Sequence, residues 1–566
     1  MARRIRWQIL IAVASSILVL GLMGYLALTS AAVSRPLAGG GFAEGLPAVP
    51  QQLNPLLSDP ARDPAAEDVR ALLFDGLMRI GTDGLPELAL AQSVVNDDAG
   101  QVYTFTLRTD VAWHDGRPLV AADVLFTLRA IQNRAFAGDP AISAVWRDVL
   151  IDQTGDRVIR CTLAAPFAPF LSLATFPILP AHLLANLPPE QWAAAPFNQR
   201  PIGTGPYQLT TIDSAHALLS ANPRYYALKD NPNQTRAFID TLELRFYPNA
   251  QAARSALLRG EIQGLGVSGG SDSAQPNLPR EMVRHAIPLD SAVVLGFNLR
   301  AEPLSDQALR RALAAGLDKD LLIKQTLDGQ ATRLDTPILP GWWAAVEDPQ
   351  WYPANQARAA EALSALGYTP GADGTRVRAG RPLALALLTL DDPDRLAVAN
   401  EIARQWGQLG VRLEIQAADA ETLRRRLAAH DFTLVLYGLQ RLGADPDVYE
   451  LWHSSKADDG SNYAGLRDDQ IDELLANARR ERDIALRASS YEAFQRRWVD
   501  LVPSIMLYQP LLIYTATNQL DGLDLDQRSG PADLATSRLV LGHAGHFRNV
   551  TRWFIRSARE IQGELR

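Results

Sequence analysis

The chain has very few of the side chains on which thiol and metal chemistry depend. It contains one cysteine, Cys161, so an intramolecular disulfide and a cysteine-based metal site are both excluded. Its eight histidines are scattered, and the HAGH pair, His543 and His546, has no third ligand cluster nearby. We therefore expect no metal and no cofactor. A chain that avoids thiols also suits an exported location.

A basic surface for nucleic acid is missing as well. The chain has 55 lysines and arginines against 63 aspartates and glutamates, which gives a net charge of −8 and a pI of about 5.6. The body carries no basic block, so the sequence predicts no nucleic-acid partner.

Two glycine-containing motifs fall short of the catalytic patterns they resemble. GVSGG, residues 266–270, fits G-x-S-x-G, but a nucleophile elbow needs a helix after the serine, and SDSAQPNLP is typical of an irregular loop. GTGPY, residues 203–207, lacks the Lys-Ser/Thr of a phosphate loop and the third glycine of a dinucleotide motif. A tight turn where two backbones approach explains its glycines better. The sequence thus predicts no catalytic residues.

A long apolar segment is present at the N-terminus. MARRIR is basic, and residues 9–33 carry no charge. This uncharged run is longer than the apolar core of a secretory signal, which has about 7–15 residues, and is long enough for a membrane-spanning helix of roughly 20 residues. We expect residues 1–35 to be an uncleaved signal-anchor with the body outside the membrane, followed by a Gly- and Pro-rich linker over 36–52. Cleavage near TSAAVS, which gives a secreted or periplasmic body, is the alternative. No cysteine follows the run, so lipid attachment there is excluded.

The body is long enough for two or three lobes and mixes strand and helix patterns. The chain has 566 residues, of which 47% are hydrophobic and 21% charged, as in a folded protein. Between Pro382 and Tyr437, three apolar strand-like runs alternate with two helical runs. This β-α-β-α-β order predicts parallel pairing, with ligands beyond the carboxyl ends of the strands. The loop after Tyr437 is therefore a pocket candidate.

Two further stretches predict local structure. In WHDGRPLVAADVLFTL, residues 113–128, Asp115-Gly116 is a turn signal and a helix follows from Ala121. His114 and Asp115 are neighbours that would point to opposite faces at a strand end, so we interpret the stretch as a structural corner and not a catalytic dyad. LSDQALRRALAAGLDKDLLIKQ predicts one helix capped by Ser305.

These landmarks, taken in order, resemble family 5 of the extracytoplasmic solute-binding proteins, which deliver oligopeptides, dipeptides or nickel to ABC importers. The matching pieces run from LNPLL through LLFDGLMRIGTDGLPELALAQS, YTFTLRTDVAWHDGRPLVAADVLFTL, PIGTGPYQL, NPRYY, LGFNLRAEPLSDQALRRALAAGLDKDLL, GADPDVYELWHSS and SNYAGLRDDQIDELL to HFRNVTRW. They cover roughly residues 50 to 555.

The resemblance implies an α/β fold of the type II periplasmic-binding-protein class, with two lobes around a ligand cleft, an extra domain and discontinuous domains. We expect lobe I to comprise 53–82, 203–288 and 505–566, the extra domain 83–202, and lobe II 289–504. It implies a monomer without enzymatic activity, which captures a peptide or peptide-like solute by hinge closure and hands it to the permease and ATPase subunits of an importer. A membrane-anchored ligand sensor and an exported hydrolase using Ser268 are the alternatives.

The resemblance also suggests ligand-binding residues. In peptide-binding members, an aspartate in the segment matching GLQRLGADPD pairs with the peptide's α-amino group, and Leu442 occupies that position here. Either Asp445 or another carboxylate substitutes, or the ligand is not an ordinary peptide, because a buried ammonium without a countercharge is costly. Arg441 next to it favours an anionic group or is a solvated surface residue. Further lining candidates are Trp342 and Trp343, with plain core as the alternative, Asn462 and Tyr463, which follow the pocket-candidate segment, and Tyr207.

Overall fold

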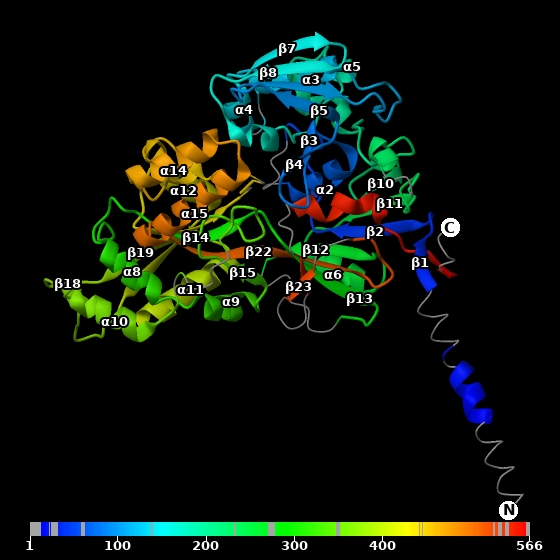
Figure 1. Ribbon diagram of the computed structural model, residues 1–566. Helices are drawn as coiled ribbons and strands as arrows, with labels where there is room; N and C mark the ends of the chain where they lie inside the picture. Colours follow the sequence, from blue (N-terminus) through cyan, green and yellow to red (C-terminus); the bar gives the residue numbers. More distant parts are fainter. Residues whose placement is uncertain are drawn as a thin grey trace, which may run out of the picture.

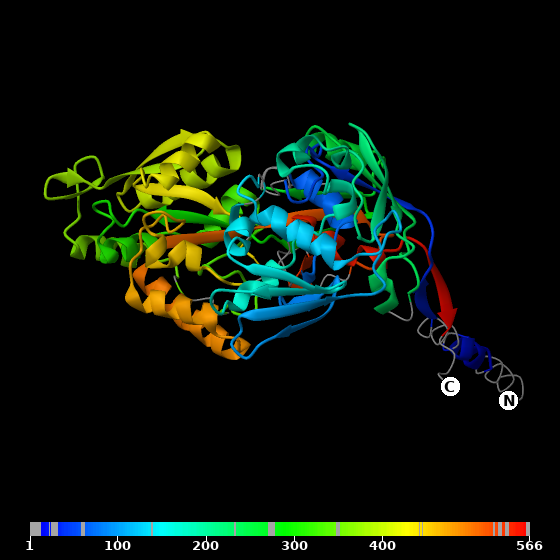
Figure 2. The same ribbon diagram turned by 90° about the horizontal axis from the view of Figure 1, so that it is seen from above.

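The structure of the protein is a computed structural model, shown in two views in Figures 1 and 2. It describes residues 13–21, 23, 32–57, 63–136, 138, 140–230, 234–269, 278–346, 351, 353–440, 442–443, 445–523, 527–529, 535–537 and 543–561.

One continuous sheet runs through the body. Its strand order is β20-β19-β21-β14-β22-β12-β2-β11-β10-β9, with β13 and β15 paired to β22. The strands span Gly41–Leu46 (β2), Tyr207–Ile212 (β9), His216–Ala221 (β10), Thr241–Phe246 (β11), Gly264–Ser268 (β12), Met282–Pro288 (β13), Ala292–Phe297 (β14), Ala331–Arg333 (β15), Ala384–Leu390 (β19), Arg412–Ala418 (β20), Leu434–Leu439 (β21) and Ser504–Thr517 (β22).

Strand β22 belongs to both halves of this sheet. Its first part pairs with β14, from Ser504 to Tyr508, and its second part pairs with β12 and β13, up to Thr517. We call the half around β2 and β9–β13 lobe I and the half around β14 and β19–β21 lobe II. Figure 1 shows β22 crossing from one to the other. The two-lobed architecture expected from the sequence is confirmed, while the exact domain boundaries remain a prediction.

Lobe II contains the predicted β-α-β-α-β unit. Strand β19 pairs in parallel with both β20 and β21, and the helices between them are α11 (Pro393–Gly407) and α12 (Ala420–Ala428). Asp392 caps α11 by accepting the backbone N–H of Arg395 at 3.1 Å. The prediction made from hydrophobic periodicity is therefore confirmed. The other helices of this lobe are α8 (Gln307–Ala315), α9 (Lys319–Leu327), α10 (Gln356–Ala365), α13 (Tyr449–Trp452), α14 (Asp469–Arg480) and α15 (Ile484–Leu501).

The single helix predicted from Ser305 is two helices. Helix α8 ends at Ala315 and α9 begins at Lys319, each with its own N-cap. The carboxylate of Asp306, not the hydroxyl of Ser305, caps α8 by accepting the N–H of Ala308 at 2.9 Å. Asp318 caps α9 by accepting the N–H of Leu321 at 2.9 Å, and this second cap explains the break.

The extra domain has a sheet of its own, ordered β5-β6-β8-β7 and drawn in blue to cyan in Figure 1. These strands span Ala91–Asn96 (β5), Val102–Leu107 (β6), Leu150–Gly155 (β7) and Val158–Thr162 (β8), with helices α3 (Ala121–Gln132) and α4 (Pro140–Trp146). One hydrophobic core joins this domain to lobe I, where α2 (Pro64–Leu73) and α6 (Ala250–Leu258) lie. The extra domain is therefore packed onto lobe I.

Residues 113–128 form the predicted corner. The ring of His114 accepts the backbone N–H of Gly203 at 3.2 Å and lies 3.2 Å from the carbonyl oxygen of Gly205, and burial lowers its pKa to about 4. Asp115 contacts a different histidine, His182, at 2.8 Å. The two neighbours thus have separate partners, which confirms the structural interpretation.

The glycines of residues 203–207 lie where two backbones meet. A Cβ atom at Gly203 would lie 1.7 Å from the carbonyl oxygen of Leu73, and one at Gly205 would lie 2.6 Å from that of Leu72. These distances are shorter than any contact a methyl group tolerates, so the close-approach explanation of the motif is confirmed.

The segment expected to be a linker, residues 36–52, contains a strand of the main sheet. Strand β2 pairs in parallel with β11 and β12, and its Phe42 and Leu46 are buried. Before it, β1 (Ala32–Pro36) pairs with β25 (Ser557–Ile561), so the two ends of the body are joined. Burial of these apolar side chains makes the segment part of the core.

Residues 13–21 and 23 are helical and project from the body in Figure 1. No helix among the described residues is long and apolar enough to span a membrane. Most of the predicted anchor, residues 1–35, lies outside the described residues.

The remaining elements are short. They are β3 (Met78–Ile80), β4 (Pro86–Leu88), β16 (Thr369–Pro370), β17 (Arg376–Arg378), β18 (Arg381–Pro382), β23 (Gln527–Ser529), β24 (Ala535–Ser537), α5 (Ala181–Leu184), and the 3₁₀ turns η1 (Ala168–Leu173), η2 (Pro189–Ala194), η3 (Pro196–Asn198), η4 (Tyr226–Asp230), η5 (Ser454–Lys456) and η6 (His543–Arg552).

Candidate functional site

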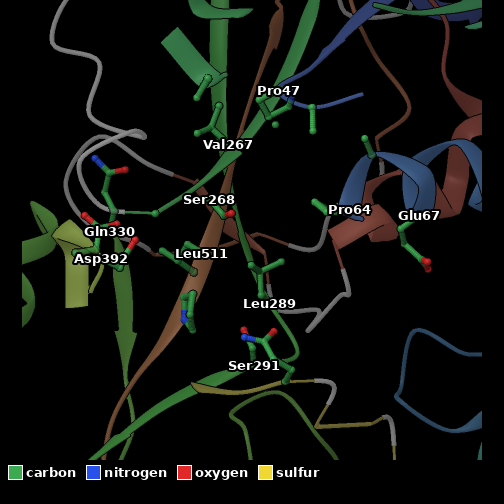
Figure 3. Close-up of a pocket in the computed structure, with 18 of the residues that line it drawn as sticks. Pro47, Pro64, Glu67, Val267, Ser268, Leu289, Ser291, Gln330, Asp392 and Leu511 are labelled. Atoms are coloured by element: carbon green, nitrogen blue, oxygen red, sulfur yellow. The ribbon is translucent and has the colours of Figure 1, made fainter. Parts of the chain in front are cut away.

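A cavity of about 660 Å³ lies where β22 passes between the lobes. In the view of Figure 3, Gln330 and Asp392 of lobe II lie on one side, Pro64 of lobe I on the other, and Ser268 between them. Its walls are formed by Pro47, Ala48, Pro64, Ala65, Glu67, Asp68, Pro248, Asn249, Ala250, Gly266, Val267, Ser268 and Gly269 from lobe I, by Leu289, Asp290 and Ser291 from the β13–β14 connection, by Leu327, Gln330, Asp392, Asp394, Arg395 and Gln440 from lobe II, and by Tyr508, Pro510 and Leu511 from β22. We call it the interlobe cavity.

Side chains from helix α11 and strand β22 meet at this cavity. The guanidinium of Arg395, in the first turn of α11, donates from Nη1 to the hydroxyl oxygen of Tyr508 at 2.8 Å. Tyr508 is buried, and desolvation raises its pKa. The contact ties the helix of lobe II to the strand shared by both lobes.

The charges in the described lining are unequal. Five carboxylates, those of Glu67, Asp68, Asp290, Asp392 and Asp394, accompany one guanidinium, that of Arg395. Glu67 forms an ion pair with the buried Arg70, outside the lining.

A second cavity of about 340 Å³ lies between the end of α2, the β3–β4 hairpin, η6 and residues 341–342 of lobe II. It is lined by Ala71, Asp75, Arg79, Ile80, Gly81, Thr82, Gly84, Pro206, Tyr225, Asp290, Gly341, Trp342, Ala544, Gly545, Phe547 and Arg548. Desolvation raises the pKa of Asp75 to about 6, although its carboxylate accepts long hydrogen bonds from Thr204 (3.3 Å) and Tyr225 (3.4 Å). Asp290 lines both cavities.

Comparison with known proteins supplies the family. The family model of bacterial extracellular solute-binding proteins, family 5 Middle, matches residues 86–461. The chain belongs to this family.

Its relatives cover nearly the whole chain. Protein XP55 of Streptomyces lividans is 30% identical over 87% of this chain and 88% of its own length. The oligopeptide-binding protein AppA of Bacillus subtilis is 26% identical over 84% of this chain and 87% of its own.

Solved structures share the fold. That of AppA from Bacillus subtilis in complex with a nonapeptide has a TM-score of 0.69 at 24% identity and covers 92% of this chain and 100% of that one. CtaP from Listeria monocytogenes, an ABC transporter substrate-binding protein, has a TM-score of 0.75 at 21% identity and covers 91% and 99%. The type II binding-protein fold expected from the sequence is confirmed.

One of the residues predicted to bind ligand, Trp342, lines the smaller cavity. Its neighbour Trp343 packs against Tyr491, with ring centroids 5.9 Å apart, and beneath the guanidinium of Arg487, 5.0 Å away. The two tryptophans thus have different surroundings, and their part in binding remains a prediction.

The segment around Leu442 is held by internal contacts. The Leu442 N–H donates to the backbone oxygen of Asp290 at 2.8 Å. The Asp445 carboxylate accepts from the buried Arg487 at 2.7 Å, and burial raises the pKa of Asp445 despite this ion pair. Arg441 lies outside the described residues.

The other three predicted residues are likewise placed by contacts within the protein. Asn462 is fully buried, donates to the backbone oxygen of Leu466 at 2.9 Å and accepts its N–H at 3.0 Å. The ring of Tyr463 lies 5.9 Å from that of Tyr437. Tyr207 is buried and donates to the backbone oxygen of Ile239 at 2.9 Å. Among the described residues, none of the three lines either cavity.

Sequence reasoning did not single out most of the cavity walls. Ser268 was noticed for its motif, and it stands on the wall as the last residue of β12, so the strand that a nucleophile elbow needs is present. Residues 270–277, which follow Gly269, lie outside the described residues. The described lining includes no histidine that could serve as a general base. The other residues lie on α2, at the start of α11 and within β22 as well as at strand ends, so no local pattern in the sequence marks them.

Proposed function

We propose that this chain is the substrate-binding component of an ABC importer, which encloses a peptide or peptide-like solute between its lobes and passes it unchanged to a membrane permease coupled to an ATPase. The observation that carries the proposal is the interlobe cavity, whose walls come from both lobes and from the strand they share. A volume of about 660 Å³ is in the range of small-molecule sites. The relatives named above as oligopeptide-binding proteins support the substrate class.

Binding would act through the equilibrium between open and closed forms. A ligand shifts this equilibrium only by its preference for the closed form, in which it contacts both walls. Closure also removes water, which strengthens the polar contacts of the ligand. The segments that cross between the lobes, β22 and the β13–β14 connection around Asp290, are the expected hinge.

The proposal includes attachment to the outer face of the membrane by the N-terminal segment, with cleavage and release as the alternative. The described part of that segment exposes large apolar side chains, among them Ile17 at 65%, Leu18 at 75% and Leu20 at 68%. Such side chains are stabilised in a lipid phase, and the basic residues before them favour the cytoplasmic side. Alkaline carbonate extraction of membranes tests it: an anchored protein stays in the pellet, and recovery in the supernatant contradicts the anchor.

Small-angle X-ray scattering of the purified full-length protein in detergent, with and without a peptide mixture, tests the central function. Hinge closure predicts a smaller radius of gyration when peptide is bound. Peptide binding without any change in the scattering curve would contradict hinge closure. If no peptide of the mixture binds, the proposed substrate class is contradicted.

A further inference from the structure

Lobe II touches the extra domain at a place to one side of β22. Arg482 lies in the short connection between α14 and α15, and its guanidinium donates from Nη1 to the backbone oxygens of Asp97 (3.3 Å) and Asp98 (3.1 Å). Its Nη2 donates to Oδ1 of Asn96 at 3.3 Å. These acceptors lie at the end of β5 and in the turn that follows it. In Figure 2 the orange helices of lobe II reach the blue strands of the extra domain at this place.

The turn of the extra domain has a shape that admits this arginine. The Asp97 carboxylate accepts the backbone N–H groups of Gln101 (2.8 Å) and Val102 (3.0 Å), so the turn is held by its own hydrogen bonds. Gly100 has a φ of +69°, and a Cβ atom there would lie 3.1 Å from Cδ of Arg482. A side chain at this position would therefore be strained and would crowd the arginine.

The connection that carries Arg482 is fixed on the lobe II side as well. Oε1 of Glu481 accepts the backbone N–H groups of Arg482 (2.7 Å) and Asp483 (2.8 Å). The Asp483 carboxylate in turn accepts two backbone N–H groups in the first turn of α15. Hydrogen bonds within lobe II thus set the backbone position from which Arg482 reaches the extra domain, so that forming the contact costs little backbone ordering.

A ring contact accompanies these hydrogen bonds. The guanidinium of Arg479, in the last turn of α14, lies 5.5 Å from the centre of the Phe167 ring of the extra domain, within cation–π range. The same guanidinium is held in lobe II by the Asp447 carboxylate at 2.9 Å and lies 3.8 Å from the ring centre of Tyr449. Asp447 and Tyr449 closely follow Leu442, so the pocket-candidate loop ends beside this contact with the extra domain.

Opening of the lobes affects these contacts and the hinge differently. Strand β22 and the β13–β14 connection run through both lobes, so they persist when the lobes separate. The contacts of Arg482 and Arg479 with the extra domain join segments far apart in the chain, and they are lost when lobe II moves away. Contacts that exist only in the closed form favour that form by their own free energy.

We propose that Arg482 is a latch between lobe II and the extra domain, which stabilises the closed form and slows the release of a bound solute. Its acceptors belong to the protein itself, so the latch acts whether or not a solute is present. Arg482 is exposed to solvent, and the effect is therefore modest, about three- to ten-fold in the ratio of closed to open forms. This inference rests on the hinge of the proposed function and adds a residue that regulates it.

Double electron–electron resonance on the full-length protein in detergent measures the latch without any ligand. Nitroxide labels at Gln153→Cys on β7 and Glu473→Cys on α14, both exposed positions, report the separation of the extra domain from lobe II. The native Cys161 is buried, and desolvation raises its pKa to about 12, so it does not take up the label. We expect a short-distance population in the labelled protein, and a shift towards longer distances in Arg482→Ala that changes the ratio of the two populations about three- to ten-fold.

Two further variants assign the effect to the guanidinium. Arg482→Lys keeps the charge and N–H donors but not the planar fork, and it should recover part of the short-distance population. Arg467→Ala is the matched control, because Arg467 is an exposed arginine whose ion pair with Asp458, at 2.6 Å, lies within lobe II. It should leave the distances unchanged. The same distance distribution with and without Arg482, or an equal shift in Arg467→Ala, would overturn the latch.

Isothermal titration calorimetry with the tripeptide Ala-Lys-Ala separates the latch from the proposed function. If only the closed form retains the solute, the apparent affinity falls with the closed fraction, so Arg482→Ala should bind the tripeptide about three- to ten-fold more weakly. An unchanged affinity overturns the role of the latch in solute release and leaves the proposed function standing. If the native protein does not bind the tripeptide, the proposed substrate class is contradicted, and the distance distributions still decide whether Arg482 holds the lobes together.

Discussion

The corner of the extra domain and the interlobe cavity are both rich in polar side chains, and they differ in how those side chains are paired. At the corner, the carboxylate of Asp123 accepts hydrogen bonds from the indole N–H of Trp113 (3.3 Å) and the backbone N–H groups of Val120 (3.1 Å) and Ala181 (3.0 Å). At the cavity, the oxygen of Gln330 has no partner among the described residues. The Asp123 carboxylate is therefore fully used within the fold, whereas the Gln330 oxygen is not bonded to any described residue.

The largest effect is expected at the corner. Asp123→Ala leaves one buried indole N–H and two partly buried backbone N–H groups without their acceptor and should lower the free energy of unfolding by about 3 to 5 kcal/mol. Urea unfolding followed by circular dichroism measures it. The exposed Asp152→Ala, which removes a surface ion pair with Arg160, is the control and should cost less than about 1 kcal/mol. Equal losses of unfolding free energy in Asp123→Ala and Asp152→Ala would contradict the structural role of the corner.

An intermediate effect is expected at the smaller cavity. The folded pKa of Asp75 is about 6, above its ordinary value of 3.8, so the folded chain holds a proton that the unfolded chain releases. Stability from this group is therefore present at low pH and is lost as the pH rises from about 4 to about 6. Relative to Asp75→Asn, which cannot titrate, the native protein should lose up to about 3 kcal/mol of its free energy of unfolding as the pH rises through that range. Urea unfolding at several pH values measures this difference. If the free energies of unfolding of the native protein and Asp75→Asn change in parallel with pH, Asp75 is not desolvated in this way.

The smallest effect is expected at the interlobe cavity. Gln330→Met removes an amide whose oxygen has no partner among the described residues and should change the free energy of unfolding by less than about 1 kcal/mol. Gln405→Met is the matched control, because the Gln405 amide accepts the N–H of Asp318 at 2.7 Å and donates to its carbonyl oxygen at 3.0 Å in the core. It should cost about 2 kcal/mol or more. Chemical unfolding of both variants measures the two losses of stability. A larger loss in Gln330→Met than in Gln405→Met would contradict the comparison.

The sequence predicted the fold better than the site. Periodic apolar runs predicted β19, α11, β20, α12 and β21, because each run buries one face against its neighbours. It missed the division of the helix after Ser305, since the second cap at Asp318 interrupts a pattern that remains apolar. It also placed β2 in a linker, because a Gly-rich strand of six residues has little signal of its own.

The site was harder to predict for a physical reason. Asn462 and Tyr207 are polar residues near motif glycines, and in the structure their polar atoms bond to backbone atoms inside the lobes. The interlobe cavity is lined by residues from distant segments, such as Pro64 and Gln330, that meet only when both lobes fold around β22. Such a meeting leaves no trace in local spacing, and Leu442 could be flagged only through the family resemblance.

Native mass spectrometry of the full-length protein released from detergent, after incubation with Ala-Lys-Ala, tests most directly whether two lobes close on a solute and leave it intact. The account predicts one complex at a one-to-one ratio, from which the tripeptide is recovered at its original mass. Absence of the complex, or recovery of shortened peptide, would contradict it.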